Sequence, residues 1–484
     1  MNRKLFFLVK IILSSIYIFA ILLLFQDRVV YFDIFVANIL TTLIILWLGP
    51  FRMIGGKYKL YSPIVVFFLG LFYYMFKGFG FALGENTALT SVISYSDIRK
   101  TFVELSLYLL ISAIIISVLY DTLIFQKRTK RTNQPVSFRV EFGYYLLLFI
   151  GITSFVLLLR SMHFQIFEFL LHPNMRGYMN SEEGIGGGFG FFYYYGFQML
   201  GIASIVKLSI FGVRKRKPSI TWYISSLVYT GTLFVLAPRA TLISYIVSVL
   251  IVYHNLIKKI NTRTILVFLI ACTIYIYGTN IWRGIVGSMN NPTVVSAAEN
   301  LRNTVDFSTY FEKILLGRDL SDIRVFTLVH HTYGNTLDFK YGSTLTRIIT
   351  QFIPRFLWAN KPLDLGIEIA QLIYPGTKSG IPPGFFGEMY MNFGNLGFIL
   401  GTLFIGLCLN WVSSFLEPPS SINRFLFFAI ITPKIFLLHS NSIGNLLGQI
   451  IISFIGLSIC LIKWRKRSDY QSSQIKFLST RIQP

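Results

Sequence analysis

Long apolar runs recur along almost the whole chain and constrain its fold more than any other feature. A helix needs about twenty mostly apolar residues to cross the hydrocarbon layer with every backbone group bonded internally. Twelve such runs are predicted as membrane spans, at residues 5–25, 29–49, 61–83, 102–125, 142–160, 191–212, 220–238, 240–257, 264–281, 385–411, 425–440 and 446–462. With 54% hydrophobic and 13% charged residues, the chain has more apolar surface than one core could hide from water. The sequence therefore predicts an all-α polytopic membrane protein.

Basic residues are spread unevenly over the loops between these runs. If the N-terminus is cytoplasmic, the predicted inner segments hold 24 of the 44 Lys and Arg residues but only three of the 21 acidic residues. Because short basic loops stay in the cytoplasm, both termini are predicted to be cytoplasmic. The net charge of +23 then reflects topology and contact with the lipid bilayer, and it does not indicate a nucleic-acid partner.

This topology divides the chain into four parts. Spans one to nine occupy residues 1–281, an extracytoplasmic loop occupies 282–384, spans ten to twelve occupy 385–462, and a basic cytoplasmic tail occupies 463–484. A loop as long as 282–384 is expected to fold, and residues 305–317 and 345–358 have the apolar spacing of short amphipathic helices. A second, shorter outer loop is predicted at 161–190. The large surfaces, and hence the substrate, are expected outside.

Ionisable residues within the predicted spans are few. Asp33, Lys77, Glu104 and Lys434 are scattered and have no obvious partner in the sequence, which argues against an ion-coupled carrier. Lys434 follows Pro433 and either faces a wet cavity, snorkels along a kinked helix or binds a phosphate. All three cysteines fall inside predicted spans, so neither a disulfide framework nor a metal site is expected.

Cations cluster at the predicted outer membrane surface. Arg239 lies at the tip of a tight hairpin in LAPRATLI, Arg283 follows the ninth span in NIWRGIVG, and Arg355 and Lys361 bracket Trp358 in FIPRFLWANKP. Fixed guanidinium groups suit the phosphates of a membrane-bound substrate, and an aromatic face beside them suits a sugar ring. The alternative is that these residues only anchor the chain to lipid headgroups.

One carboxylate opens the tenth span. Glu388 lies in PPGFFGEMYMNFGNLG, where it is predicted either to accept a proton from a reacting hydroxyl or to serve the start of a helix by pairing with an arginine. Tyr390 and Asn392 follow within one helical turn and either bind sugar hydroxyls or pack.

These elements, in this order, resemble the Wzy-type polysaccharide polymerases, the oligosaccharide repeat unit polymerases. The resemblance runs from about Phe234 to Gly406 and rests on PR-x-x-W-x-x-KP, on GE-x-Y-x-NFG-x-x-G and on the twelve-span layout with a large late outer loop. It implies an architecture like that of GT-C glycosyltransferases and O-antigen ligases, in the cytoplasmic membrane of a bacterium.

The resemblance also implies a reaction. Such enzymes transfer a growing glycan from undecaprenyl diphosphate to the non-reducing end of a new lipid-linked repeat unit, for O-antigen or capsule, without a metal or other cofactor. It assigns Arg239, Arg283, Arg355 and Lys361 to the diphosphate, Glu388 to the acceptor hydroxyl, and Trp358, Tyr390 and Asn392 to sugars. In related ligases a histidine of the large outer loop is the base, which makes His330 and His331 the second candidates. A chain-length regulator and a flippase are the expected protein partners.

Other functions remain open on the sequence. An O-antigen-type ligase would share the fold and the donor and differ only in its acceptor, and GE-x-Y-x-NFG favours the polymerase. A lipid-linked oligosaccharide flippase or other transporter would show more symmetric spans, a charged central cavity and no large folded outer loop. A structural scaffold would leave the coincident arginines unexplained.

Overall fold

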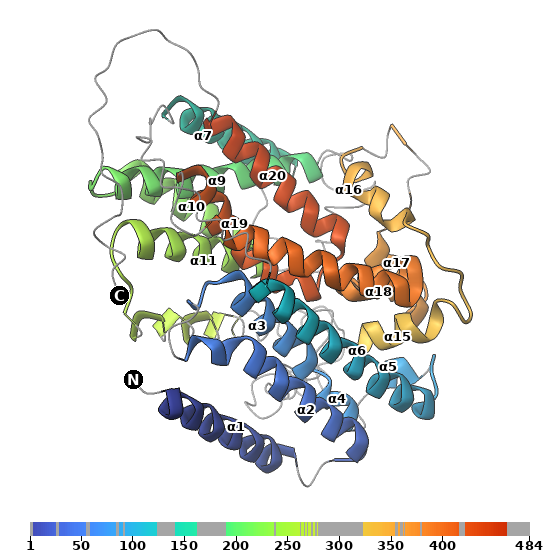
Figure 1. Ribbon diagram of the computed structural model, residues 1–484. Coiled ribbons are helices and arrows are strands. Elements are labelled where there is room, and N and C mark those ends of the chain that lie inside the picture. The colour runs from blue at the N-terminus through green and yellow to red at the C-terminus, as the bar shows by residue number, and fades with distance from the viewer. Residues whose placement is uncertain are drawn as a thin grey trace, which may run out of the picture. The chain divides into compact units, whose positions relative to one another are not determined.

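The protein is described by a computed structural model (Figure 1). It describes residues 3–261 with gaps at 26–28, 55–58, 84–86, 91, 123–140, 162–189 and 237–238, parts of 263–278, residues 323–415 with gaps at 354–356, 359–361, 363 and 378–379, and residues 422–461. These residues form helices and connecting turns with no β-strand, apart from one isolated bridge between Tyr333 and Leu337. The all-helical prediction is confirmed over this part of the chain.

Seven helical segments in the described ranges are long and apolar enough to cross a membrane. They comprise α2 (Phe32–Leu48) with η2 (Pro50–Met53), α3 (Pro63–Phe76) with α4 (Phe79–Ala82), α6 (Tyr95–Thr122), α7 (Glu141–Ser161), α9 (Gly190–Val213), α18 (Gly384–Ser413) and α20 (Ile443–Leu461). Shorter apolar helices lie within α1 (Arg3–Phe25), α10 (Ile220–Leu236), α11 (Arg239–Leu256) and at Arg263–Cys272. The predicted span 425–440 coincides with α19 (Ile422–Phe436) and η5 (Leu437–His439). This is the architecture of a polytopic membrane protein, while twelve spans and cytoplasmic termini remain predictions.

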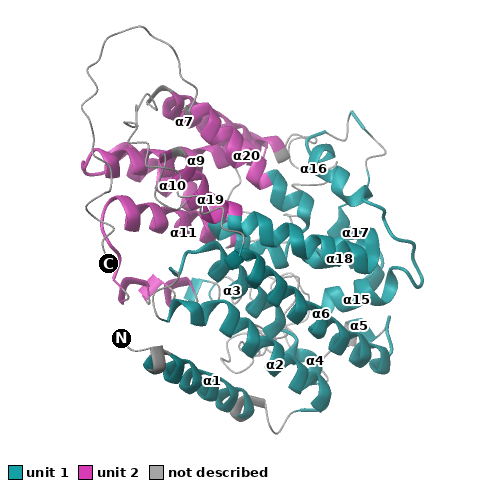
Figure 2. Cartoon of the chain, viewed as in Figure 1, with its two compact units in different colours: residues 1–123, 273–410, 432–448 teal, residues 124–272, 411–431, 449–484 magenta. Residues whose placement is uncertain are grey.

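The chain forms two compact units, coloured separately in Figure 2. Unit 1 contains residues 1–123, 273–410 and 432–448, and unit 2 contains residues 124–272, 411–431 and 449–484. Unit 1 therefore combines the N-terminal helices with the described part of the predicted outer loop and most of α18. All candidate site residues described below, except Arg239, belong to unit 1.

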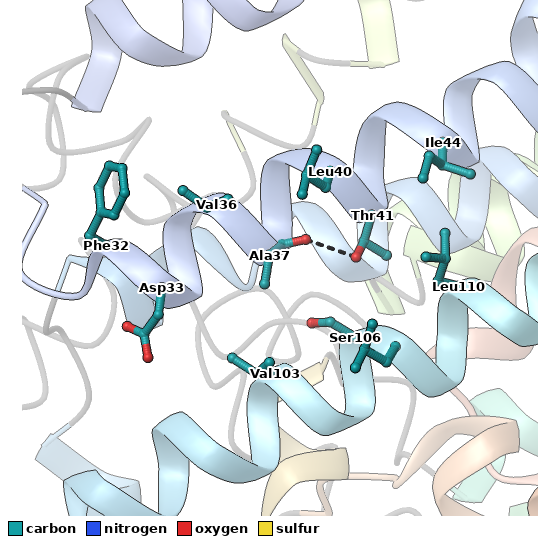
Figure 3. Close-up of a pocket in the computed structure, with 11 residues that line it drawn as sticks. Phe32, Asp33, Val36, Ala37, Leu40, Thr41, Ile44, Val103, Ser106 and Leu110 are labelled. Atoms are coloured by element: carbon teal, nitrogen blue, oxygen red, sulfur yellow. Dashed lines mark hydrogen bonds between the residues drawn. The ribbon is translucent and has the colours of Figure 1, made fainter.

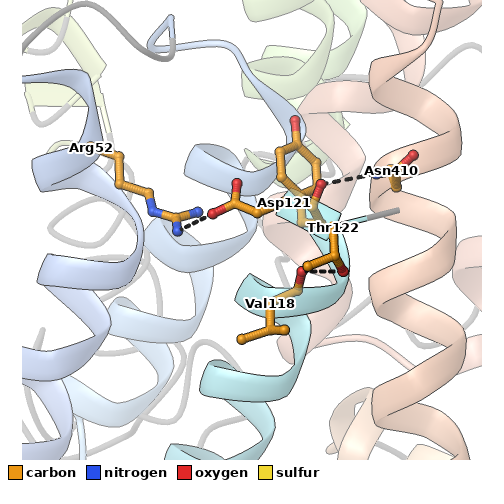
Figure 4. A network of polar contacts seen from close by, with 6 residues as sticks. Arg52, Val118, Asp121, Thr122 and Asn410 are labelled. Carbon is orange, nitrogen blue, oxygen red and sulfur yellow. Dashed lines mark hydrogen bonds and ion pairs between the residues drawn. The ribbon is translucent and has the colours of Figure 1, made fainter. Parts of the chain in front are cut away.

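Polar contacts tie the helices of unit 1 together. At the C-terminal end of α6, Asp121 forms an ion pair with Arg52 of η2 at 2.6 Å, and the carbonyl of Tyr120 accepts the side-chain amide of Asn410 at 2.9 Å (Figure 4). Further along α6, the hydroxyls of Ser112 and Thr402 lie 2.8 Å apart in the buried interface with α18. Because polar groups buried among apolar side chains need partners, these bonds fix α6 against α18.

Unit 2 is built on close packing between α7 and α9. A Cβ atom on Gly151 would lie 2.8 Å from the backbone nitrogen of Leu200, and one on Gly196 would lie 2.0 Å from the Ser154 hydroxyl. Small residues let membrane helices approach closely, so these two glycines set the α7–α9 contact. Ser204 of α9 then accepts the indole N–H of Trp222 from α10 at its carbonyl, at 2.9 Å.

Helix α18 is not one continuous rod. Phe393 and Gly394 have non-helical dihedrals, with φ +58° and ψ −141° at Gly394, a conformation that only glycine adopts without strain. A Cβ on Gly397 would lie 2.1 Å from the carbonyl oxygen of Met389, and the rings of Phe386 and Phe398 are 5.2 Å apart. The chain therefore reverses at 393–394, and a first arm, 384–392, lies against a second arm, 395–413.

This reversal corrects the predicted span at 385–411. Only the second arm, about 28 Å long at 1.5 Å per residue, is long enough to cross the hydrocarbon layer alone. The first arm folds back beside it.

The predicted outer loop is also built differently from the expectation. Residues 345–358 do not form one amphipathic helix: η4 (Ser343–Thr346) and α16 (Arg347–Thr350) are followed by a turn. The structure instead contains two helices that were not predicted, α15 (Ile323–Thr332) and α17 (Leu365–Ile373). The predicted helix at 305–317, the second outer loop at 161–190 and the basic tail at 463–484 lie outside or almost entirely outside the described residues.

Candidate functional site

The first arm of α18 carries polar side chains on two opposite faces. Glu388 and Asn392 are four residues apart and share one face, whereas Tyr390 projects from the other. The arm begins after Pro382 and Pro383 at Gly384, whose φ of +73° and contact with the carbonyl of His439 leave no room for a side chain. Two clusters are built on these faces, which we call the Glu388 network and the His330 cluster.

The Glu388 network joins the first arm to the start of α20. Glu388 is 1% exposed, and its Oε2 accepts the backbone N–H of Ile443 at 2.6 Å. Thr344 hydrogen-bonds to the same carboxylate and accepts the side-chain amide of Asn392 at 2.6 Å. A carboxylate at a helix N-terminus satisfies a free N–H and meets the positive end of the helix dipole. This contact is structural, but it differs from the predicted ion pair with an arginine, because the partner is a backbone N–H of another helix.

Asn392 is occupied in the same way. Its side-chain Oδ1 accepts the N–H of Gly342 at 2.9 Å, and its Nδ2 also donates to the carbonyl of Glu388 at 2.7 Å. The residue is 0% exposed. Its polar atoms thus hold the 342–344 turn against the first arm, as the packing alternative predicts.

An ion pair lies beside this network. Arg347 of α16 pairs with Asp364, and its charge also acts on Glu388. Asp364 caps α17 by accepting the N–H of Gly366 at 2.8 Å. The aliphatic stem of Arg347 runs over Gly444 of α20, where a Cβ would lie 3.3 Å from it. Among the described residues, the arginine whose charge acts on Glu388 is therefore Arg347, which was not among the predicted site residues.

The His330 cluster forms on the opposite face of the first arm. The imidazole of His330, at the end of α15, stacks on Tyr390 with ring centroids 4.5 Å apart and planes at 29°. Tyr108 of α6 meets His330 edge-on at 6.1 Å and donates its hydroxyl hydrogen bond to Oε1 of Glu104 at 3.1 Å. Asn395, at the start of the second arm, also hydrogen-bonds to Tyr108. His330 and Tyr390 were predicted as site residues, and the fold brings them together.

The electrostatics of this cluster suit a proton acceptor. Burial lowers the pKa of His330 below its usual value, the nearby Glu104 carboxylate opposes that shift, and His331 adds to it. An imidazole with a lowered pKa is neutral at neutral pH and can accept a proton. His331 is next to His330 on α15, and adjacent residues of a helix project from different faces, so at most one of the two histidines can face Tyr390.

Glu104 and Tyr108 are the residues that sequence reasoning missed. Glu104 was noted only as an isolated acid within a predicted span. An ionisable side chain at such a position is by itself a reason to search for a partner. Its hydrogen-bond partner Tyr108 lies one turn along the same helix, whereas His330, on which its charge acts, lies in a helix, α15, which the apolar pattern did not predict.

The remaining predicted residues are placed only in part. Arg239 is the first residue of α11, and Trp358 is 37% exposed in a non-helical segment. Arg283, Arg355 and Lys361, which are expected diphosphate ligands, lie outside the described residues.

A groove of about 470 Å³ runs between α2 and α6 (Figure 3). Its walls are mainly aliphatic, with Val36, Leu40 and Ile44 from α2 facing Val103, Leu107 and Leu110 from α6. Asp33 lies at one end, where it pairs with Arg99 at 3.1 Å. Such walls match hydrocarbon, as expected for helices that face lipid.

Among the described residues, no group of three or more His, Cys, Asp or Glu side chains is arranged to hold a metal ion. No protein-family model matches the chain, and neither a curated protein nor a solved structure shows significant similarity to it.

Proposed function

We propose that the protein is a membrane glycosyltransferase that polymerises oligosaccharide repeat units linked to undecaprenyl diphosphate. The observation that carries this proposal is the stacking of His330 on Tyr390, because it joins a histidine from the predicted outer loop to the GE-x-Y-x-NFG element. The motif resemblance and the apolar helices support the same class of enzyme. The reaction is proposed to take place at the outer face of a bacterial cytoplasmic membrane.

In the proposed reaction, His330 takes the proton of the acceptor sugar hydroxyl. The hydroxyl oxygen forms a bond to the anomeric carbon of the donor glycan while the bond from that carbon to the diphosphate oxygen breaks. The lipid diphosphate leaves with the electron pair of the broken bond. Cationic side chains stabilise the negative charge that develops on it, a role proposed for Arg239, Arg283, Arg355 and Lys361.

Reconstitution into proteoliposomes with a lipid-diphosphate repeat unit tests the proposal. A ladder of products marks a polymerase, and a single transfer to a different lipid acceptor marks an O-antigen-type ligase. Movement of the intact repeat unit across the bilayer without a new glycosidic bond marks a flippase and would overturn the proposal.

A matched pair of variants locates the proton acceptor. His330→Asn should lower the rate on the order of a hundredfold or more, as loss of a general base does. His331→Asn on the same helix should retain most of the activity. Equal activity of the two variants would remove His330 from the mechanism.

A further inference from the structure

Glu104 is placed where a carboxylate has few structural reasons to be. Helix α6 has 28 residues and is about 42 Å long, which exceeds a hydrocarbon thickness of about 30 Å. Its first turns, YSDIRKT at 95–101, are polar and suit the membrane surface. Glu104 follows them by about one turn, at the edge of the apolar part, so its charge is costly unless it has a role.

Among the described residues, a hydrogen bond and electrostatic interactions join Glu104 to the His330 cluster. Its Oε1 accepts the Tyr108 hydroxyl at 3.1 Å, and its charge acts on both His330 and Tyr390. Tyr108 in turn packs edge-on against His330, and its ring lies 5.6 Å from that of Phe398 of the second arm, with the planes tilted by 39°. The carboxylate, the phenol and the imidazole are thus held together by two helices and by the reversal in α18.

We propose that Glu104, held by Tyr108, is a positioning residue that orients His330 and stabilises the positive charge His330 acquires when it takes a proton. This inference rests on the proposed function for its catalytic meaning. In hydrolase triads a carboxylate performs the same two tasks through a direct hydrogen bond to the imidazole. Here the charge of Glu104 acts on His330, and Tyr108, which is bonded to Glu104, packs against the imidazole ring. In the proposed reaction Glu104 binds neither sugar, and its effect passes through His330.

The groups that face His330 are Glu104 and Tyr108 from α6, Tyr390 from α18 and His331 from its own helix. Of these described residues, Glu104 is the one with a carboxylate. Replacing it with glutamine therefore lowers the pH at which His330 titrates, since the remaining neighbours favour the neutral imidazole.

The first experiment measures this titration directly, without any enzymatic assay. The full-length protein, labelled with ¹⁵N-histidine, is titrated by NMR, and His330→Asn identifies the His330 resonances among the six histidines. Glu104→Gln should shift the His330 midpoint to lower pH. Asp97→Asn removes a carboxylate from the exposed start of the same helix and should leave the midpoint unchanged. Equal midpoints in wild type and Glu104→Gln would overturn the proposal.

The second experiment measures the reaction. Glu104→Gln should lower kcat by about tenfold or more with little change in KM, as expected for a group that acts in the transition state. The acid limb of its pH profile should move to lower pH together with the NMR midpoint. A fall in kcat with an unshifted acid limb would assign Glu104 to packing and overturn the proposal.

Two further variants keep the test decisive. If Glu104→Gln does not accumulate as folded protein, Glu104→Asp retains the charge one methylene further away and should shift both readouts in the same direction by less. Tyr108→Phe removes only the hydroxyl and should lower kcat without moving the midpoint downward. A wild-type protein that titrates as expected but joins no repeat units would overturn the proposed function and leave the pairing of Glu104 with His330 standing.

Discussion

The carboxylate of Glu388 accepts the backbone N–H of Ile443 at 2.6 Å, although the two residues are on different helices of unit 1. This bond closes the first turn of α20 with a side chain from the first arm of α18. The acid at the centre of the GE-x-Y-x-NFG element therefore has a structural task that is complete without substrate. Its neighbour Tyr390 points the other way, toward His330.

Substitution of Glu388 should separate structure from chemistry. Glu388→Gln keeps an oxygen that can accept the Ile443 N–H, so it should retain folding and most activity. Glu388→Ala leaves that buried N–H without a partner and should cost about 1–3 kcal/mol of stability. Thermal unfolding in detergent measures the difference. Loss of activity in Glu388→Gln with unchanged stability would restore Glu388 as the proton acceptor.

The pH dependence of the reaction should reflect His330. Because burial lowers the pKa of His330, the imidazole stays neutral as the pH falls through about 6.5, the ordinary pKa of histidine. Activity should therefore be lost only at a lower pH. A pH–rate profile of kcat/KM in proteoliposomes measures this limb. An acid limb at or above the ordinary value would contradict the assignment of His330 as the base.

The reversal in α18 should depend on glycine. Gly394→Ala forces a Cβ into a backbone conformation at φ +58° and ψ −141° and should cost about 1–3 kcal/mol. Gly231→Ala in α10 is the control, because no atom lies within 4 Å of its Cβ position and alanine favours helix. The yield of monodisperse protein and the unfolding temperature measure the stability of both variants. Wild-type stability in Gly394→Ala would argue against the reversed arm.

The ion pair of Arg347 and Asp364 should contribute a measurable coupling free energy to stability. Their side chains are 21% and 30% exposed, so a double-mutant cycle of Arg347→Ala and Asp364→Asn should give about 0.5–1 kcal/mol. Lys340 and Glu368, 2.5 Å apart but 31% and 37% exposed, provide a comparison pair whose coupling should be smaller and fade with salt. A coupling energy of zero for the first pair would show that Asp364 serves only as the cap of α17.

The expected diphosphate ligands can be tested by product length. Arg239→Ala and Arg355→Ala, at unchanged expression, should abolish polymer and leave single lipid-linked repeat units. Lys258→Ala removes an exposed charge from a predicted cytoplasmic loop and should leave chain length unchanged. Normal polymer in both arginine variants would refute the phosphate assignment.

The sequence predicted the helices better than the site. Long apolar runs located α2, α6, α9 and α20 because a membrane span needs its length and hydropathy in one stretch. The turn inside α18 escaped prediction, since Gly394 in an apolar run is equally typical of close helix packing. The positive φ that identifies the turn is a property of the backbone and not of the residue type alone.

The partners within the site escaped prediction for a different reason. Arg347 was part of a predicted amphipathic helix, and its position next to Asp364 depends on the turn that ends α16. Glu104 was visible in the sequence, but its relation to His330 arises from the packing of α15 on α6. Spacing along one helix is local information, whereas both of these contacts join separate segments.

The first arm of α18 links the Glu388 network on one of its faces to the His330 cluster on the other. Its Glu388 is bound to the start of α20 and its Asn392 to the 342–344 turn, while its Tyr390 forms a wall of the His330 cluster. The distance between the His330 imidazole and the Tyr390 ring therefore depends on the contacts that Glu388 and Asn392 make on the opposite face of the arm. Substitutions in the first turn of α20 should therefore be epistatic with substitutions in α15, although these segments share no reacting group.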